Sequence, residues 1–163
     1  MKSVEQVTIF LGQGWGENTT RSREAALSDL AENGGAQFVD LQKLNISLLP
    51  HGATLEDFGD WGKDRVNDLQ IQQKLAEMLQ NKAMPAPAAG TVYVVYLAPE
   101  VNSSLGAHKP GKDYVAYHNF VHVPSAELRY VVVPFDANAD RQLTAASRAL
   151  VETALNPNGN GWY

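Results

Sequence analysis

The sequence predicts a single α+β domain over residues 1–163, in which a mixed β-sheet packs against helices. Two segments, VYVVYLA and YVVVPF, are almost continuously apolar, as is typical of central strands covered on both faces. Amphipathic stretches with helical spacing separate the strand-like segments. The chain has 163 residues, of which 44% are hydrophobic and 19% are charged, which is enough for one soluble domain with its own core. The predicted order of elements is βααβαβββα.

The first half of the chain contains two predicted strands and two predicted helices. A strand over 7–11 ends at Gly12, and the glycine-rich loop after it lacks the spacing of a phosphate-binding loop. A helix over 21–32 follows, and its apolar face is predicted to comprise Ala25, Ala26, Leu27 and Leu30. A second short helix is marked by Phe38, Leu41 and Leu44. A strand over 46–50 ends at a proline, and residues 51–67 predict a loop or a ragged hairpin.

The second half contains two predicted helices and three predicted strands. Asp68 is a suitable cap for a helix over 69–81, whose inner face is predicted to comprise Leu69, Gln72, Leu75, Ala76 and Leu79. A stiff proline-rich linker follows, and strands are then predicted over 91–97, 114–123 and 128–135. The last helix is predicted to begin near Asp140 and to end before Pro157.

Charge and composition exclude several classes of function. The formal net charge is -5 and no run of Lys or Arg occurs, which argues against nucleic acid as a partner. The chain has no Cys, so it contains neither a disulfide framework nor a thiolate nucleophile. No apolar run approaches the roughly 20 residues of a transmembrane helix. The start of the chain leads directly into a strand, so we expect no signal peptide.

Two of the four histidines are candidates for a site. His118 and His122 are four residues apart in a strand-like segment, which places them about 13 Å apart at roughly 3.3 Å per residue. Two residues this far apart cannot both reach one metal ion through bonds of about 2 Å. We therefore expect two hydrogen-bonded histidines on one face of a strand, with a functional role for His118 as the alternative. His51 and His108 lie in predicted loops and are expected to be solvated.

The last helix is amphipathic and contains nothing catalytic by its own chemistry. Its predicted inner stripe comprises Leu143, Ser147, Leu150, Val151, Ala154 and Leu155. Arg148 and Glu152 are four residues apart, which allows an ion pair worth about 0.3 kcal/mol. Aromatic residues that suit either recognition or core packing are also present: Trp15, Trp61, Trp162 and Tyr163.

Four segments occur in an order known from one protein family. They are VTIFLGQGWG, MPAPAAGTVYVVYLAPE, YHNF, and SRALVETALNP with the following GWY. Through them the chain resembles the phosphate-induced, Exordium-like family and its bacterial relatives, which have a zincin-like fold. In that family the last helix carries a His-Glu motif that supplies a zinc ligand and a general base, so zinc is the cofactor that the resemblance implies.

Two departures from this motif change the functional expectation. Arg148 occupies the position of the zinc-binding His, and a guanidinium cannot ligate zinc because it stays protonated. Ala149 occupies the position of the general base, whereas Ser147 and Glu152 match the family helix. The family also continues past its Trp-Tyr into an acidic segment that this chain lacks after Tyr163. We therefore predict a zincin-like protein with a degenerate motif, no catalytic residues and no bound metal.

The resemblance and these departures together predict a non-catalytic binding protein whose partner is a peptide, a glycan or a protein. The candidate binding residues are His118, His122, Trp15, Trp162 and Tyr163. Two alternatives stay open. In the first alternative, the chain is a subunit or interaction module of a larger assembly and forms an oligomer. In the second, it is a hydrolase with a rearranged metal site made by His118, His122 and Glu152. Because family members are usually exported, the resemblance implies an extracellular or periplasmic location.

Overall fold

The computed structural model describes residues 1–62 and 64–163. The strands are β1 (Ser3–Leu11), β2 (Ser47–Leu48), β3 (Ala53–Asp57), β4 (Thr91–Leu97), β5 (Tyr117–Val123), β6 (Ala126–Val133) and β7 (Gly161–Trp162). The α-helices are α1 (Arg21–Asn33), α2 (Ala36–Lys43), α3 (Asp68–Gln80) and α4 (Ala139–Leu155), and two short 3₁₀ helices, η1 (Gln13–Gly16) and η2 (Asn18–Thr20), precede α1. The fold is therefore α+β, as predicted.

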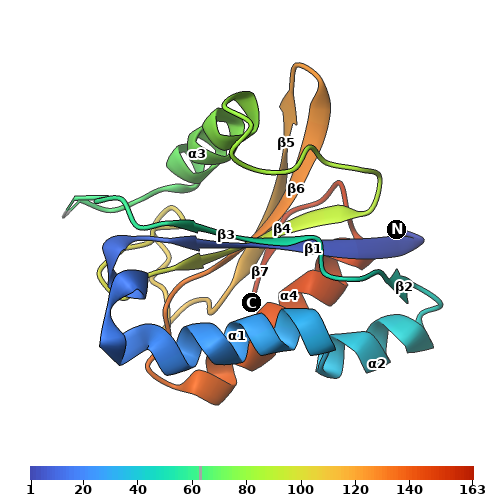
Figure 1. The fold of residues 1–163 in the computed structure, drawn as a ribbon, viewed down its shortest axis with the longest axis horizontal. Helices are drawn as coiled ribbons and strands as arrows, with labels where there is room; N and C mark the ends of the chain where they lie inside the picture. The colour runs from blue at the N-terminus through green and yellow to red at the C-terminus, as the bar shows by residue number, and fades with distance from the viewer. Residues whose placement is uncertain (63) are drawn as a thin grey trace.

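The described strands form one mixed sheet whose central strands, β1, β4 and β6, run parallel (Figure 1). Strand β1 pairs in parallel with β4 along one edge and with β2 and β3 along the other. Strand β6 pairs in parallel with β4, and β5 and β7 then continue the sheet in antiparallel orientation. The carboxyl ends of β1, β3, β4 and β6 consequently lie at the same edge of the sheet.

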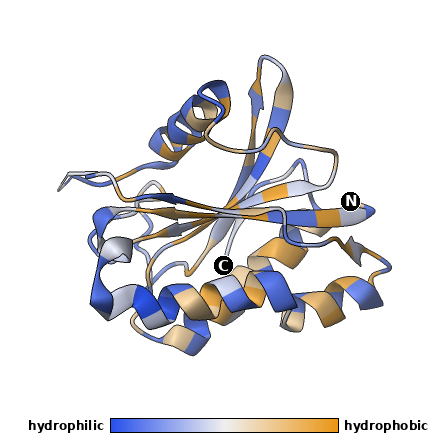
Figure 2. Ribbon diagram, viewed as in Figure 1, coloured by the Kyte–Doolittle hydropathy of each residue, from blue (hydrophilic) through white to orange (hydrophobic). Residues whose placement is uncertain are grey.

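Helices cover both faces of this sheet. Helices α1, α2 and α4 lie on one face and α3 lies on the other (Figure 1). The helices carry both hydrophobic and hydrophilic residues along their length (Figure 2), whereas β4, with the sequence TVYVVYL, is mostly apolar. All seven residues of β4 are buried, which explains the continuous apolar run that predicts a central strand. Each fully buried Val or Leu in such a strand contributes about 1.5–3 kcal/mol relative to an exposed one.

The predicted order of elements lacks two strands that the structure contains. β3 lies within the segment predicted as a loop or hairpin, and its residues alternate between partly buried and exposed. Such a half-exposed edge strand with two acidic residues gives a weak apolar signal. β7 has two residues and is too short for any periodicity to reveal it. The predicted strands over 46–50 and 114–123 are shorter in the structure, over 47–48 and 117–123.

The helix faces also differ from the predicted ones. Leu27 and Ala31 are the buried residues of α1, whereas Ala25 and Ala26 are exposed. In α3 the buried residues are Ile71, Leu75 and Met78, while Leu69 is 59% exposed. Asn67 rather than Asp68 caps α3, through a reciprocal capping box with Gln70. Among the described helices, none is both long and apolar enough to cross a membrane.

Candidate functional site

Helix α4 carries Ser147, Arg148, Ala149 and Glu152, which the resemblance aligns with the family helix, and it packs on the sheet through small side chains. Its buried residues include four alanines, which let the helix approach the strands closely: Ala145, Ala146, Ala149 and Ala154. Ala149 is 0% exposed, so the position expected to hold a general base is a packed methyl group in the core. A carboxylate at this position would lose its hydration without a partner, which costs several kcal/mol.

Ser147 has a structural partner on a neighbouring helix. Its Oγ donates a hydrogen bond to Oε1 of Gln37 on α2 at 2.9 Å. Gln37 is itself 1% exposed, and its Nε2 donates to the Leu30 carbonyl of α1 at 2.9 Å. Ser147 therefore joins α4 to α2, and through Gln37 to α1, by a buried polar chain, which explains a polar residue on the inner stripe of α4.

Arg148, Tyr163 and His118 form a contiguous group at the end of the chain. The Arg148 guanidinium lies over the Tyr163 ring, 5.3 Å from its centroid. The Tyr163 hydroxyl is hydrogen-bonded to Nδ1 of His118, and the two rings stack with centroids 5.7 Å apart. Among the described residues, Arg148 makes no ion pair with Glu152, so the predicted i,i+4 pair is replaced by the contact with Tyr163.

Burial keeps His118 and Tyr163 uncharged near neutral pH. Burial lowers the pKa of His118, and the opposing effects of Glu152 and of the Asn156 backbone are smaller. Burial and then the charge of Glu152 raise the pKa of Tyr163 to about 12, while Arg148 acts in the opposite direction. The group therefore offers neutral hydrogen-bonding partners and one guanidinium, without an ionised nucleophile.

The rearranged metal site requires residues that the fold keeps apart. His118 is 3% exposed and close enough to Glu152 for its pKa to respond. The side chain of His122 is 75% exposed and lies 3.2 Å from Glu127, which also pairs with Arg129 at 2.5 Å. In residues 1–62 and 64–163, no group of three or more His, Asp or Glu side chains is placed to hold a metal ion. These residues therefore do not fit a zinc ion, which needs three or four protein ligands.

The two remaining histidines are not simply solvated. Nε2 of His51 lies 2.9 Å from Oγ1 of Thr8, and burial lowers the pKa of His51 against the opposing charges of Glu32 and Glu5. His108 stacks on the Trp162 ring with centroids 4.3 Å apart. Contacts with the fold thus replace the solvation predicted for both residues.

The candidate aromatic residues divide between core and surface. Trp15 is 2% exposed, donates its indole N–H to the Tyr96 carbonyl at 3.0 Å and packs between Phe10 and Phe135. It is thus a core residue and has no surface for recognition. Trp162 is 49% exposed and Tyr163 is partly buried, so the accessible aromatic surface lies at the end of the chain.

Three cavities lie beside α4 or beside the last residues of the chain. The first, of about 670 Å³, lies between α2 and α4 and has Arg148 and Glu152 on its wall. The second, of about 310 Å³, is bounded by Arg148, Tyr163 and the first turns of α4. The third, of about 300 Å³, is bounded by His118, Gly161 and Trp162. Because Arg148 borders two of them, a ligand in either can reach its guanidinium.

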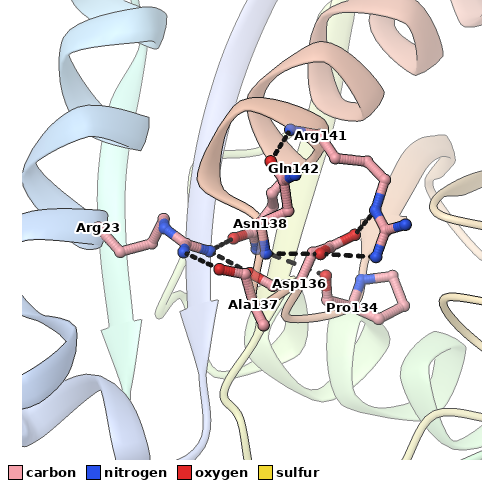
Figure 3. Close-up of polar contacts among 7 residues, drawn as sticks. All are labelled: Arg23, Pro134, Asp136, Ala137, Asn138, Arg141 and Gln142. Atoms are coloured by element: carbon pink, nitrogen blue, oxygen red, sulfur yellow. Dashed lines mark hydrogen bonds and ion pairs between the residues drawn. The ribbon is translucent and has the colours of Figure 1, made fainter.

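A fourth cavity lies where the sequence indicates no site, at the carboxyl ends of β4 and β6. The loop after β6 is held from both sides by arginines (Figure 3). Arg23 donates to the carbonyls of Asp136 and Ala137 and to Gln142, and Arg141 binds the Asp136 carboxylate through Nε and Nη2. In open sheets with parallel strands, ligands bind at this edge. The sequence could have revealed it only through the parallel pairing of β4 and β6, which no local pattern encodes.

Comparison with protein-family models and with curated proteins found no match for the chain.

Proposed function

We propose that this protein is a non-catalytic, zincin-like binding protein that recognises its partner beside Arg148. The observation that carries the proposal is the contact of Arg148 with Tyr163, whose hydroxyl bonds His118. At the position where the resemblance implies a metal ligand, the chain has a guanidinium that is fixed by an aromatic ring. The packed methyl group of Ala149 supports the same proposal, because it leaves no general base next to Arg148.

The proposed partner is a peptide, a glycan or another protein with an anionic or polar group for Arg148. Arg148 is exposed and borders the cavities on both sides of α4. A guanidinium that lies over the face of an aromatic ring does not use its N–H donors for that contact, so they stay available for a carboxylate. The resemblance further suggests an extracellular or periplasmic setting for this binding.

A binding screen tests this function. Labelled protein is applied to arrays of random decapeptides and of glycans. Arg148→Ala is compared with Lys2→Ala, which removes an exposed charge just before β1 from a residue that borders neither cavity beside Arg148. We expect a subset of ligands whose affinity falls about tenfold in Arg148→Ala, roughly 1.4 kcal/mol, and is unchanged in Lys2→Ala. The proposal would be contradicted if the protein hydrolysed the peptides and a chelator stopped this hydrolysis. It would also be contradicted if all ligands bound Arg148→Ala and Lys2→Ala equally well.

A second candidate function is that of an interaction module in a larger assembly. It is favoured by large apolar side chains that are exposed on α2 and at the end of α4. They are Phe38 at 46%, Val39 at 47% and Leu155 at 52% exposure. Apolar residues gathered on one surface are typical of protein interfaces. Light scattering of the purified protein distinguishes this function, because it predicts an oligomer that Phe38→Glu dissociates.

A further inference from the structure

The cavity at the carboxyl ends of β4 and β6 has the size and the walls of a small-molecule site. Its volume is about 630 Å³, within the range of about 300–1,000 Å³ common for such sites. Pro99 follows β4, while Pro134 and Phe135 follow β6, and these rings give the cavity an apolar wall. The remaining wall comes from the segments that contain Arg65 and Lys109.

One side of this cavity is pre-formed. Arg23 crosses from α1 and binds the backbone of the loop after β6 (Figure 3). Its guanidinium also lies 4.7 Å from the centroid of the Phe135 ring. On the other side of the loop, the Asn138 N–H donates to Oδ1 of Asp136 at 2.8 Å and Arg141 holds both carboxylate oxygens. A loop held in this way loses little entropy when a ligand binds.

The charge of the cavity opposes that of the whole protein. Arg65, Lys109 and Arg141 border it together with one carboxylate, Asp136, which leaves a local charge of +2 in a chain of net charge -5. Within the described part of the chain, the side chains of Arg65 and Lys109 form no ion pair. The nearby Asp113 carboxylate accepts the Lys109 backbone N–H at 2.7 Å and does not border the cavity. Arg141 uses Nε and Nη2 for Asp136, so its guanidinium keeps donors for a second anion.

From this arrangement we propose that the cavity binds a small phosphate monoester, with its phosphate held by Arg65, Lys109 and Arg141. A phosphate monoester carries a charge of about −2 near pH 8, which matches the local excess of positive charge. Its organic part lies against Pro99, Pro134 and Phe135. This binding goes beyond the proposed function, since it uses other loops and does not involve Arg148, although Arg141 also borders the cavity beside Tyr163.

The experiment is calorimetric titration at pH 8 with phenyl phosphate and, separately, with inorganic phosphate. The test variant is Arg65→Gln/Lys109→Gln. The control is Lys2→Gln/Lys82→Gln, which removes the same total charge from exposed residues that do not border the cavity. All four positions are exposed, so circular dichroism and thermal melting should show that both variants fold like the wild type.

We expect phenyl phosphate to bind with a stoichiometry of one and at least tenfold more tightly than inorganic phosphate. The test variant should weaken this binding at least tenfold, and the control variant should leave it unchanged. The proposal is overturned if phenyl phosphate does not bind, if both double variants weaken it equally, or if inorganic phosphate binds as tightly. Arg148→Ala should leave phenyl phosphate binding intact, so failure of this site and failure of the proposed partner recognition are distinguishable.

Discussion

Glu24 on α1 is partly buried and lies beside Glu56 on β3, which is exposed. Burial first, and then the hydrogen bond and the charge of Glu56, together raise the pKa of Glu24 to about 7 against the opposing charge of Arg21. A carboxyl group whose pKa is raised by folding stabilises the fold below its unfolded pKa, about 4.5, and loses this contribution as the pH rises through about 7.

Glu24→Gln should therefore stabilise the protein at alkaline pH. We expect the free energy of unfolding to exceed that of the wild type by about 0.5 kcal/mol at pH 8, the size of a solvent-screened repulsion between like charges. The advantage should shrink as the pH falls from about 7 to about 4.5. Urea unfolding at several pH values measures it, with Glu17→Gln, an exposed residue just before α1, as the control. A difference in unfolding free energy that stays constant across this pH range would rule out the raised pKa of Glu24.

At the scale of elements, β7 is short but positions the whole group around His118. Gly161 of β7 lies opposite His118 of β5, and the Tyr163 N–H donates to the Ala116 carbonyl at 2.8 Å. A Cβ atom on Gly161 would lie 2.9 Å from the Tyr163 hydroxyl oxygen and 3.1 Å from Cε1 of His118. The absence of a side chain at this position is thus a requirement for the contact between Tyr163 and His118.

Gly161→Ala should consequently separate Tyr163 from His118. We expect a loss of stability of about 1 kcal/mol, as for other overpacking substitutions, and a pKa of His118 closer to its ordinary value because burial is the main cause of its shift. NMR titration of the histidine ring measures the pKa, and thermal unfolding measures the stability. The control is Gly16→Ala, where the nearest atom to an added Cβ is 3.4 Å away. An unchanged His118 pKa would disprove this role of β7.

The sequence predicts those helices and strands that a local pattern of apolar residues marks. It does not predict features that depend on how distant strands pair. The apolar runs of β4 and β6 predict central strands because both faces of these strands are buried. β3 escapes prediction because its residues alternate between solvent and fold at the sheet edge. Helix faces are poorly predicted where alanine dominates, as at Ala25 and Ala26, because a methyl group is tolerated on either face.

The candidate site follows the same division. Arg148 and Ala149 are candidates from the sequence only through the resemblance, whereas no local pattern reveals the partner of Arg148. Spacing along a helix suggests Glu152, but Tyr163, which lies on another segment, offers an aromatic face instead. The cavity between Arg65, Lys109 and Arg141 joins residues from three distant segments, so only the folded chain brings them together.

For the whole molecule, the two histidines whose pKa is lowered on folding predict how stability depends on pH. Burial lowers the pKa of both His51 and His118 from the ordinary value of 6.5. Below about pH 6.5 these two histidines therefore bind more protons in the unfolded chain than in the folded chain. Stability contributed by these groups is therefore lost as the pH falls through this range. Chemical denaturation between pH 7.5 and 5 should show a smaller loss in His118→Gln than in the wild type. Parallel curves for the two proteins would contradict the prediction.

The position of β1 at the centre of the sheet has a consequence for synthesis of the chain. One edge of β1 can pair as soon as β3 has been synthesised. The other edge pairs with β4, where Glu5 lies 86 positions before its partner Thr91. At roughly 5–20 residues per second, a ribosome needs about 4–17 s to supply that partner. During this interval the apolar segment Val7–Leu11 is an open strand edge, and a chaperone that binds extended apolar segments has its target there.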